Sequence, residues 1–352
     1  MNNPVSTYRL QFHSGFTFRN FERIIPYLDK LGVRTIYASP IFEAVPGSVH
    51  GYDSVNPQRI NPEIGTLAQL KAISQQLTKR GMRWIQDIVP NHMAFHPRNT
   101  WLMDVLEKGQ RSPYASFFDI DWTSPVHKGR LMVPFLGAPL AEVIDQGDLT
   151  VAYQDGKFEI RYFETAYPLN LRSYTTILTA DSQRPTDAVQ TLLDNINKLQ
   201  KLRKPDAYAR QYDATCLETL GELMKETAGK AYVKRCLKTV NATPSCIQQI
   251  ADEQEYRLCY HGETDQQINF RRFFTVNSLI CLNIQDPAVF EAVHQLPKAL
   301  LEAGVFQGLR IDHIDGLYDP SQYLERLREL AGEDAYIVVE KILQNDEELP
   351  TY

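Results

Sequence analysis

Two short segments near the end of the sequence each join an apolar run to a carboxylate. The first, Gly308–His313, carries Asp312, and the second, Tyr336–Lys341, carries Glu340. The two acids are 28 positions apart, and a helical pattern lies between them. If both runs are neighbouring parallel strands, Asp312 and Glu340 emerge at the same edge of the sheet. Two carboxylates that face each other across a cleft can break a glycosidic bond.

Polar side chains also follow the other predicted strands. In folds that alternate strands and helices, working residues collect at the carboxyl ends of the strands, where the loops begin. The recurrence of polar residues there indicates a site, although any one of them alone would be a weak signal. In chain order they are Gln11 and His13, then His50, Tyr52 and Asp53, then Asp87, Asn91 and His92, then Arg310 and His313.

Structural roles remain open for these residues. Asp87 lies inside a strand-like run, and holding a loop by hydrogen bonds is the simplest role for it. His50 and His92 are equally compatible with buried histidines whose hydrogen bonds are satisfied. Arg310 and Asp312 alternate on one strand face and could be a buried ion pair, although such a pair is costly to bury and adds little stability. Tyr52 could be an ordinary packing residue. Glu340 and Lys341 could be a solvated charge pair.

The first ninety residues alternate strands and helices in a regular way. The alternation predicts parallel strands with right-handed crossovers. It resumes near Pro287 with a helical pattern over residues 288–303, which we expect Pro297 to interrupt. The predicted strands cover residues 7–12, 33–42, 82–89, 308–312 and 336–341, and the predicted helices cover residues 18–31, 67–79, 288–303 and 320–330.

The stretch between the third and fourth predicted strands does not follow this alternation. It mixes aromatic residues, prolines and short β-like runs such as residues 157–163, and then turns helical and highly charged. We therefore expect a long, largely helical insertion over residues 98–285, between two parts of one α/β domain at residues 1–97 and 286–352. These parts supply about five strand–helix units of the (β/α)8 barrel type, which needs eight to close. Either the sheet stays open or the sequence belongs to a longer protein.

Composition excludes several classes of partner. The 352-residue chain is 43% hydrophobic and has a formal net charge of −6, so no basic face is implied and nucleic acid is not expected. No run of about 18 apolar residues exists, so a membrane is not expected either. The five cysteines show no CxxC pair and fit free thiols in a reducing compartment. Because the N-terminus does not read as a signal peptide, these features predict a cytoplasmic location.

Several segments resemble motifs of a known enzyme family. In order, His50–Asp53, Asp87–His92, Gly308–Asp312 and Val339–Glu340 resemble motifs of the alpha-amylase superfamily of glycoside hydrolases. A narrower resemblance, to the maltooligosyltrehalose synthase family, covers essentially the whole chain. The segments that carry it are Ser6–Phe12, Tyr37–Ile41, Asn269–Phe274 and Arg310–Leu317.

Enzymes of that family convert the reducing-end α-1,4 bond of a maltooligosaccharide into an α,α-1,1 bond by an intramolecular, retaining transfer. The resemblance implies that Asp312 is the nucleophile and Glu340 the general acid/base. It also implies that Tyr52, with Asp53 beside it, is the platform beneath the reacting sugar. Maltooligosaccharide is the expected partner, without cofactor or metal, and the remaining contacts are assigned to His50, Asn91, His92, Arg310 and His313.

These roles place opposite demands on the two acids. Arg310 lies two residues before Asp312 and so points to the same strand face, where its cation should keep Asp312 ionised. Glu340 must hold a proton at neutral pH, so we expect its surroundings to raise its pKa. Water must be excluded while the freed glucose turns, and we assign that enclosure to the insertion. Replacing the insertion by a short loop would then raise the ratio of free glucose to trehalose-type product.

One part of the superfamily pattern is absent from the sequence. The superfamily uses a third carboxylate, in a His-Asp motif on a later strand, and the sequence ends before such a motif. The chain alone is therefore expected to be an inactive fragment. A longer chain or a second polypeptide would have to supply the missing strands.

Three other functions remain open. The first is hydrolysis or ordinary transglycosylation of α-1,4-glucans, which would create new reducing ends. The second is a glucan-binding module without catalysis, which would bind maltooligosaccharides and leave them intact. The third is a metal enzyme whose ligands would be His92, Asp312, His313 and Asp315. The spacing of these residues matches no compact ligand motif.

Overall fold

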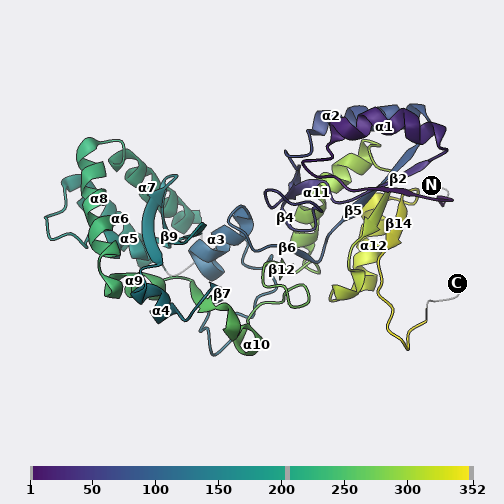
Figure 1. Ribbon diagram of the computed structural model, residues 1–352. Helices are drawn as coiled ribbons and strands as arrows, with labels where there is room; N and C mark the ends of the chain where they lie inside the picture. The colour runs from purple at the N-terminus through teal and green to yellow at the C-terminus, as the bar shows by residue number, and fades with distance from the viewer. Residues whose placement is uncertain (1–2, 203–206, 349–352) are drawn as a thin grey trace. The chain divides into compact units, whose positions relative to one another are not determined.

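The computed structural model describes residues 3–202 and 207–348 of the chain. The chain divides into two compact units (Figure 1). The first unit contains residues 1–99, 116–119 and 272–352, as far as these are described, and the second contains residues 100–115 and 120–271. Every residue to which the sequence assigned a chemical role lies in the first unit.

The insertion ends earlier in the chain than the sequence suggested. Residues 272–285 were assigned to the insertion, but they belong to the first unit. The reason is a strand pairing: β12 (Leu279–Cys281) pairs antiparallel with β6 (His92–Ala94). Because buried backbone groups need hydrogen-bond partners, this pairing keeps the segment beside His92. The boundary at residue 286 is therefore corrected to residue 272.

The first unit is built on one open parallel sheet of order β1-β2-β5-β13-β14 (Figure 1). All four pairings in it are parallel, and the strands keep their order along the chain. The sheet does not close on itself within residues 3–202 and 207–348. The predicted mixed α/β class is confirmed, and the strands are β1 (Tyr8–Leu10), β2 (Thr35–Ala38), β5 (Arg83–Ile88), β13 (Gly308–Ile311) and β14 (Tyr336–Val339).

Helices connect successive strands, as the hydrophobic periodicity predicts. The first two are α1 (Phe18–Lys30) and α2 (Leu67–Lys79), and Figure 1 shows them side by side above β2 and β5. α2 begins with a capping box: the Thr66 side chain accepts the N–H of Gln69, and the Gln69 side chain accepts the N–H of Thr66. The later helices are α11 (Pro287–Glu302) and α12 (Pro320–Ala331).

The main hydrophobic core of the first unit joins this sheet to α1 and α2. Burial of these side chains is the dominant favourable term for this unit. Trp84 on β5 is fully buried, and its ring stacks on those of Phe12 and Phe306, with ring centroids 5.9 and 6.1 Å apart. It therefore packs β5 against segments that are far apart in the sequence. Other members of the core are Phe18, Phe21, Ile25, Leu28, Ile36, Leu70, Ile73 and Leu77.

The predicted strand over residues 33–42 is two separate strands. β2 ends at Ala38, and β3 (Phe42–Ala44) pairs antiparallel with β4 (Ser54–Ile60) rather than extending the sheet. Pro40 lies between β2 and β3, and proline has no N–H to donate to a strand ladder. The loop after β2 is thereby directed to the segment that contains His50 and Tyr52.

The interruption predicted at Pro297 is wrong. α11 continues through Pro297, which is buried along with Val293 and Leu300. These three positions lie on one helical face, and tertiary packing of such a face supplies most of the stability of a helix in a protein. The packing therefore offsets the hydrogen bond that the proline lacks.

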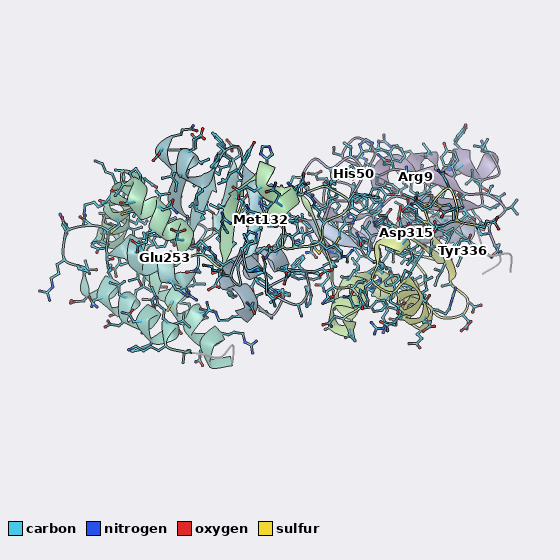
Figure 2. All side chains as sticks on the ribbon, turned by 90° about the horizontal axis from the view of Figure 1, so that it is seen from below. Arg9, His50, Met132, Glu253, Asp315 and Tyr336 are labelled. Carbon is cyan, nitrogen blue, oxygen red and sulfur yellow. The ribbon has the colours of Figure 1, made fainter. Side chains whose placement is uncertain are left out.

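In its described residues, the second unit is largely helical and contains two small sheets. Figure 2 labels two of its residues, Met132 and Glu253. Strands β8, β9 and β10 form an antiparallel sheet, and β7 pairs parallel with β11. Its helices are α3 (Thr100–Lys108), α4 (Leu140–Asp145), α5 (Leu171–Leu178), α6 (Asp187–Gln200), α7 (Ala207–Leu223), α8 (Thr227–Asn241), α9 (Pro244–Asp252) and α10 (Thr264–Gln267), and its strands are β7 (Leu131–Leu136), β8 (Leu149–Gln154), β9 (Lys157–Tyr162), β10 (Thr165–Pro168) and β11 (Tyr256–Tyr260).

None of the helices in the described part of the chain is both long enough and apolar enough to span a bilayer.

Candidate active site

Strand register brings Asp312 and Glu340 to one edge of the sheet. In the pairing of β13 with β5, Arg310 lies beside Asp87. Just beyond the strand ends, the N–H groups of Asp312 and Glu340 each donate to a carbonyl group of the neighbouring strand at 2.9 Å. The two acids therefore leave adjacent strands at the same level of the carboxyl edge, where parallel α/β folds form their sites.

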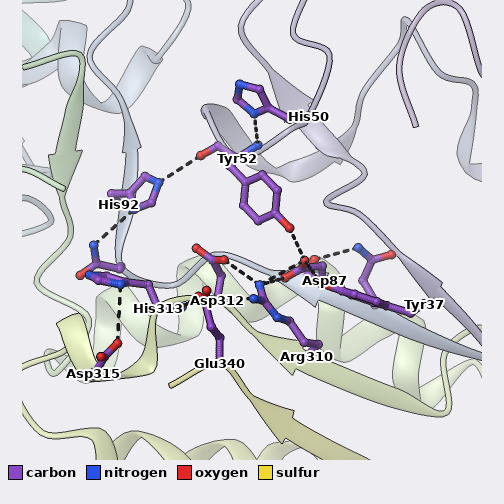
Figure 3. A network of polar contacts seen from close by, with 12 residues as sticks. Tyr37, His50, Tyr52, Asp87, His92, Arg310, Asp312, His313, Asp315 and Glu340 are labelled. Carbon is purple, nitrogen blue, oxygen red and sulfur yellow. Dashed lines mark hydrogen bonds and ion pairs between the residues drawn. The ribbon is translucent and has the colours of Figure 1, made fainter. Parts of the chain in front are cut away.

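Arg310 is the centre of the polar network at this edge (Figure 3). Its Nη1 donates to both carboxylate oxygens of Asp87, at 3.0 and 3.2 Å, and to Oδ1 of Asp312 at 2.6 Å. Its Nη2 lies 3.3 Å from Oε2 of Glu340. A planar guanidinium with five donors can bind several carboxylates at once. Arg310 thus holds Asp312 and Glu340 on the same side of the sheet.

Asp87 is enclosed and bound by three side chains. Its side chain is 0% exposed, and its Oδ2 accepts hydrogen bonds from the hydroxyls of Tyr37 at 2.7 Å and Tyr52 at 2.6 Å. Burial raises the pKa of Asp87, and Arg310 and the two hydroxyls oppose that rise. Burial, followed by the charge of Asp87, raises the pKa of Tyr37 to about 12, so this hydroxyl stays protonated and donates. Asp87 therefore holds Arg310, Tyr37 and Tyr52 in one arrangement.

Asp312 is also buried, and burial dominates its ionisation. Loss of contact with water raises the pKa of Asp312 to about 6, although the hydrogen bond from Arg310 acts in the opposite direction. Asp87 and Glu340 add to the rise because they carry like charges. Arg310 thus favours the ionised form of Asp312, as expected, but burial has the larger effect on the pKa. Asp312 is mainly ionised at pH 7 but becomes protonated below about pH 6.

Glu340 is more accessible than Asp312, with 34% of its side chain exposed against 11%. Its Oε2 accepts the backbone N–H of His313 at 2.9 Å. His313 has a left-handed backbone, with φ of 52°, just before the short 3-10 helix Ile314–Gly316. This local turn, together with Arg310, fixes the position of the Glu340 carboxylate.

The other residues singled out from the sequence surround this pair. The Nε2 of His92 lies 3.1 Å from the carbonyl oxygen of Tyr52, and its Nδ1 lies 3.3 Å from the amide nitrogen of Asn91. Asn91 and His92 are each only 1% exposed. His50 is 47% exposed and accepts the N–H of Tyr52 at 3.0 Å, while Asp53 lies 3.8 Å from it. His50 and His92 therefore both hold the backbone of Tyr52 (Figure 3).

Known proteins are similar to this chain over nearly its whole length. A family model for the alpha-amylase catalytic domain matches residues 22–141. A putative maltooligosyl trehalose synthase of Mycobacterium tuberculosis is 34% identical over 98% of this chain and 35% of its own length. The maltooligosyltrehalose synthase of Arthrobacter ramosus, a solved structure, is 33% identical over 99% of this chain and 36% of its own, with a TM-score of 0.71.

Residues 22–141 thus match the alpha-amylase catalytic domain, and nearly the whole chain is similar to part of the maltooligosyl trehalose synthases. A hypothetical maltooligosyl trehalose synthase of Sulfolobus tokodaii has a similar fold, with a TM-score of 0.67 and 28% identity over 99% of this chain. The chain spans about a third of the length of these relatives.

Three residues of the site were not singled out from the sequence. Tyr37 reads as a packing residue in an apolar strand, and only the alignment of β2 with β5 brings its hydroxyl to Asp87. Phe273 and Phe274 lay in the predicted insertion, yet their rings contact His313 at 4.8 and 5.1 Å. All three residues are in segments that carried the narrower family resemblance, which was the one available signal.

The metal site considered from the sequence does not form within the described ranges. Of its four residues, His313 and Asp315 approach each other, at 3.6 Å. Across residues 3–202 and 207–348, no group of three or more His, Cys, Asp or Glu side chains is arranged to hold a metal ion.

Proposed function

We propose that this chain is the N-terminal part of an enzyme that converts the reducing-end α-1,4 bond of a maltooligosaccharide into an α,α-1,1 bond. Similarity to maltooligosyl trehalose synthases over nearly the whole chain supports the reaction class. The observation that carries the proposal is that one guanidinium, that of Arg310, binds both Asp312 and Glu340. Retaining glycosidases need two carboxyl groups about 5–5.5 Å apart, and a shared cation favours such closeness.

In the proposed mechanism, Asp312 attacks the anomeric carbon of the sugar next to the reducing-end glucose and forms a glycosyl ester. Glu340 gives its proton to the glycosidic oxygen, so the terminal glucose leaves as a neutral molecule with a free hydroxyl. The freed glucose then turns within the site. Its anomeric hydroxyl attacks the anomeric carbon that is bound to Asp312, Glu340 takes the proton, and the bond between that carbon and the Asp312 oxygen breaks. Two inversions give net retention.

The five parallel strands fit the first part of a (β/α)8 barrel. The residues beyond the matched third of the relatives would supply the remaining strands and the third carboxylate of the superfamily, on the same chain or on a second polypeptide. The chain alone is then expected to bind maltooligosaccharides without converting them. Since the five cysteines are all free in the structure, we retain a reducing, cytoplasmic location as part of this proposal.

Product analysis tests the proposal directly. Maltopentaose is incubated with the complete enzyme and, separately, with the 352-residue chain. The complete enzyme should give a non-reducing pentasaccharide, while the chain alone gives none. Formation of new reducing ends by the complete enzyme would instead identify a hydrolase, and product formation by the chain alone would show that this third is sufficient.

The acidity of Asp312 predicts the acidic limb of the pH profile. The nucleophile must be ionised, and its pKa is raised to about 6 by burial. Activity should therefore be present above pH 6 and fall about tenfold for each pH unit below it, in kcat/KM of the complete enzyme, which reports the free enzyme. An acidic limb near pH 4, the ordinary range for aspartate, would contradict the burial argument.

A further inference from the structure

Two non-glycine residues beside the site have left-handed backbone conformations. Phe274 has φ of 47°, and His313, which directly follows Asp312, has φ of 52°. Bulky residues rarely adopt this conformation, and such strain persists where the surrounding structure enforces it, often at functional sites. The strain at His313 has a visible use, because its N–H binds Glu340. The strain at Phe274 needs a separate explanation.

The rings of these residues form a continuous aromatic row. The ring centroid of Phe273 lies 4.5 Å from that of His92 and 4.8 Å from that of His313. The ring centroid of Phe274 lies 5.1 Å from that of His313 and 4.6 Å from that of Phe273. The His313 ring also lies close to Gly316, where an added Cβ would be 2.2 Å from it. The row therefore runs from the side chain that holds Tyr52 to the turn that holds Glu340.

Exposure separates the two phenylalanines. Phe273 is half-buried and serves the packing of the row, whereas Phe274 is 62% exposed. Because the Phe274 ring is largely exposed, its burial within the chain contributes little free energy to offset the strain of its backbone. Its ring lies next to His313, whose N–H binds Glu340, so its exposed face is placed to contact a ligand.

We propose that Phe274 is a specificity residue whose ring stacks on the glucose that leaves during the reaction. This inference rests on the proposed function. Glu340 protonates the leaving oxygen, so the leaving glucose lies on the Glu340 side of the broken bond. Phe274 stands on that side through His313, while Tyr52 stands with Asp87 on the other side of Arg310 (Figure 3 shows His313, Tyr52, Asp87 and Arg310).

Stacking suits a sugar that must be kept in place and yet turn. Hydrogen bonds fix the direction of each hydroxyl, whereas contact between a sugar face and an aromatic ring is mainly dispersion and apolar burial, which depend weakly on rotation in the plane. A stacked glucose can therefore expose its anomeric hydroxyl to the ester without escaping to water. Losing the ring should release glucose before the second step.

Binding of maltopentaose to the 352-residue chain tests the contact without turnover. By calorimetry, Phe274→Gly should weaken binding about 3–10-fold, since it removes the ring and keeps a residue that favours the left-handed backbone. Phe274→Tyr should restore binding because it keeps a stacking face. The matched control is Phe163→Gly: Phe163 is also left-handed, with φ of 50°, and is 67% exposed, but lies in the second unit. It should leave binding unchanged.

The outcomes distinguish this inference from the proposed function. Binding that survives Phe274→Gly but is lost in Tyr52→Ala would overturn the role of Phe274 and leave the glucan site intact. Absence of binding by the unaltered chain would overturn both. In the complete enzyme, Phe274→Gly should raise the share of free glucose over non-reducing product several-fold, with the acidic limb near pH 6 unchanged. An unchanged product ratio would contradict the proposed role.

Discussion

Replacing Asp312 by Asn is expected to abolish turnover by the complete enzyme and, at the same time, to stabilise the first unit. Loss of the proposed nucleophile should lower kcat by about 10⁴-fold or more, as loss of a nucleophile does in other enzymes. The gain in stability follows from burial. The pKa of Asp312 is about 6 in the folded chain, above the ordinary value of an aspartate, so the ionised group destabilises the fold.

The gain in stability of Asp312→Asn should depend on pH, and the direction of that dependence can be measured. Asp312 binds its proton more tightly in the folded than in the unfolded chain, so its contribution to stability is lost as pH rises through about 6. Asp312→Asn should therefore raise the free energy of unfolding by about 1–3 kcal/mol at pH 7.5. The difference should shrink toward zero near pH 4, where the wild-type group is already neutral.

Two variants with the same loss of activity separate the effects. Glu340→Gln should also be inactive, but the Glu340 side chain is 34% exposed, so its replacement should change stability little. Because the chain has two units, the readout is hydrogen exchange of the backbone amides of β5 and β13 rather than one global melting curve. Slower exchange in Asp312→Asn alone supports the argument. Faster exchange would mean that the charge of Asp312 stabilises the fold through Arg310.

The framework of the first unit could be predicted because its signals are local. Helical periodicity marked α1 and α2 within one residue. Pro297 shows the limit of such reasoning. Its local preference is to end a helix, but the packing of a buried face, which depends on residues distant in sequence, decides the outcome.

The site was predictable in its carboxylates and not in its geometry. Acids at the ends of apolar runs are visible in a sequence, and Asp312 and Glu340 lie at the same edge of the sheet. That Tyr37 donates to Asp87 depends on strand register, which a one-residue shift would change. The raised pKa of Asp312 depends on burial, so sequence alone favoured the effect of Arg310 over that of lost water.

Replacing Arg310 by Met is expected to destabilise the first unit strongly. Arg310 is the cation that contacts Asp87, Asp312 and Glu340, and the Asp87 side chain is 0% exposed. Without it, two tyrosine hydroxyls remain to bind a buried carboxylate that has no counter-charge. Breaking a buried pair by removing one partner costs about 3–5 kcal/mol. The loss should be larger at pH 8 than at pH 5, because protonation of Asp87 relieves the unpaired charge.

The conservative variant tests whether shape matters as well as charge. Arg310→Lys keeps a cation, but a single ammonium group on a flexible stem cannot reproduce the planar fork that contacts three carboxylates. Its stability should fall between those of the wild type and Arg310→Met. Urea unfolding, followed by exchange of the β5 and β13 amides, measures all three proteins under the same conditions.

A double-mutant cycle with Asp87→Asn isolates the cause. If Arg310→Met acts by leaving Asp87 unpaired, the double variant should recover at least half of the lost stability, since an amide can keep the hydrogen bonds from Tyr37 and Tyr52 without a charge. Asp87→Asn alone should cost less than Arg310→Met, because Arg310 retains Asp312 and Glu340 as partners. Strict additivity of the two changes would mean that the two groups do not depend on each other. The Arg310–Asp87 pair would then not be what holds Asp312 and Glu340 in position.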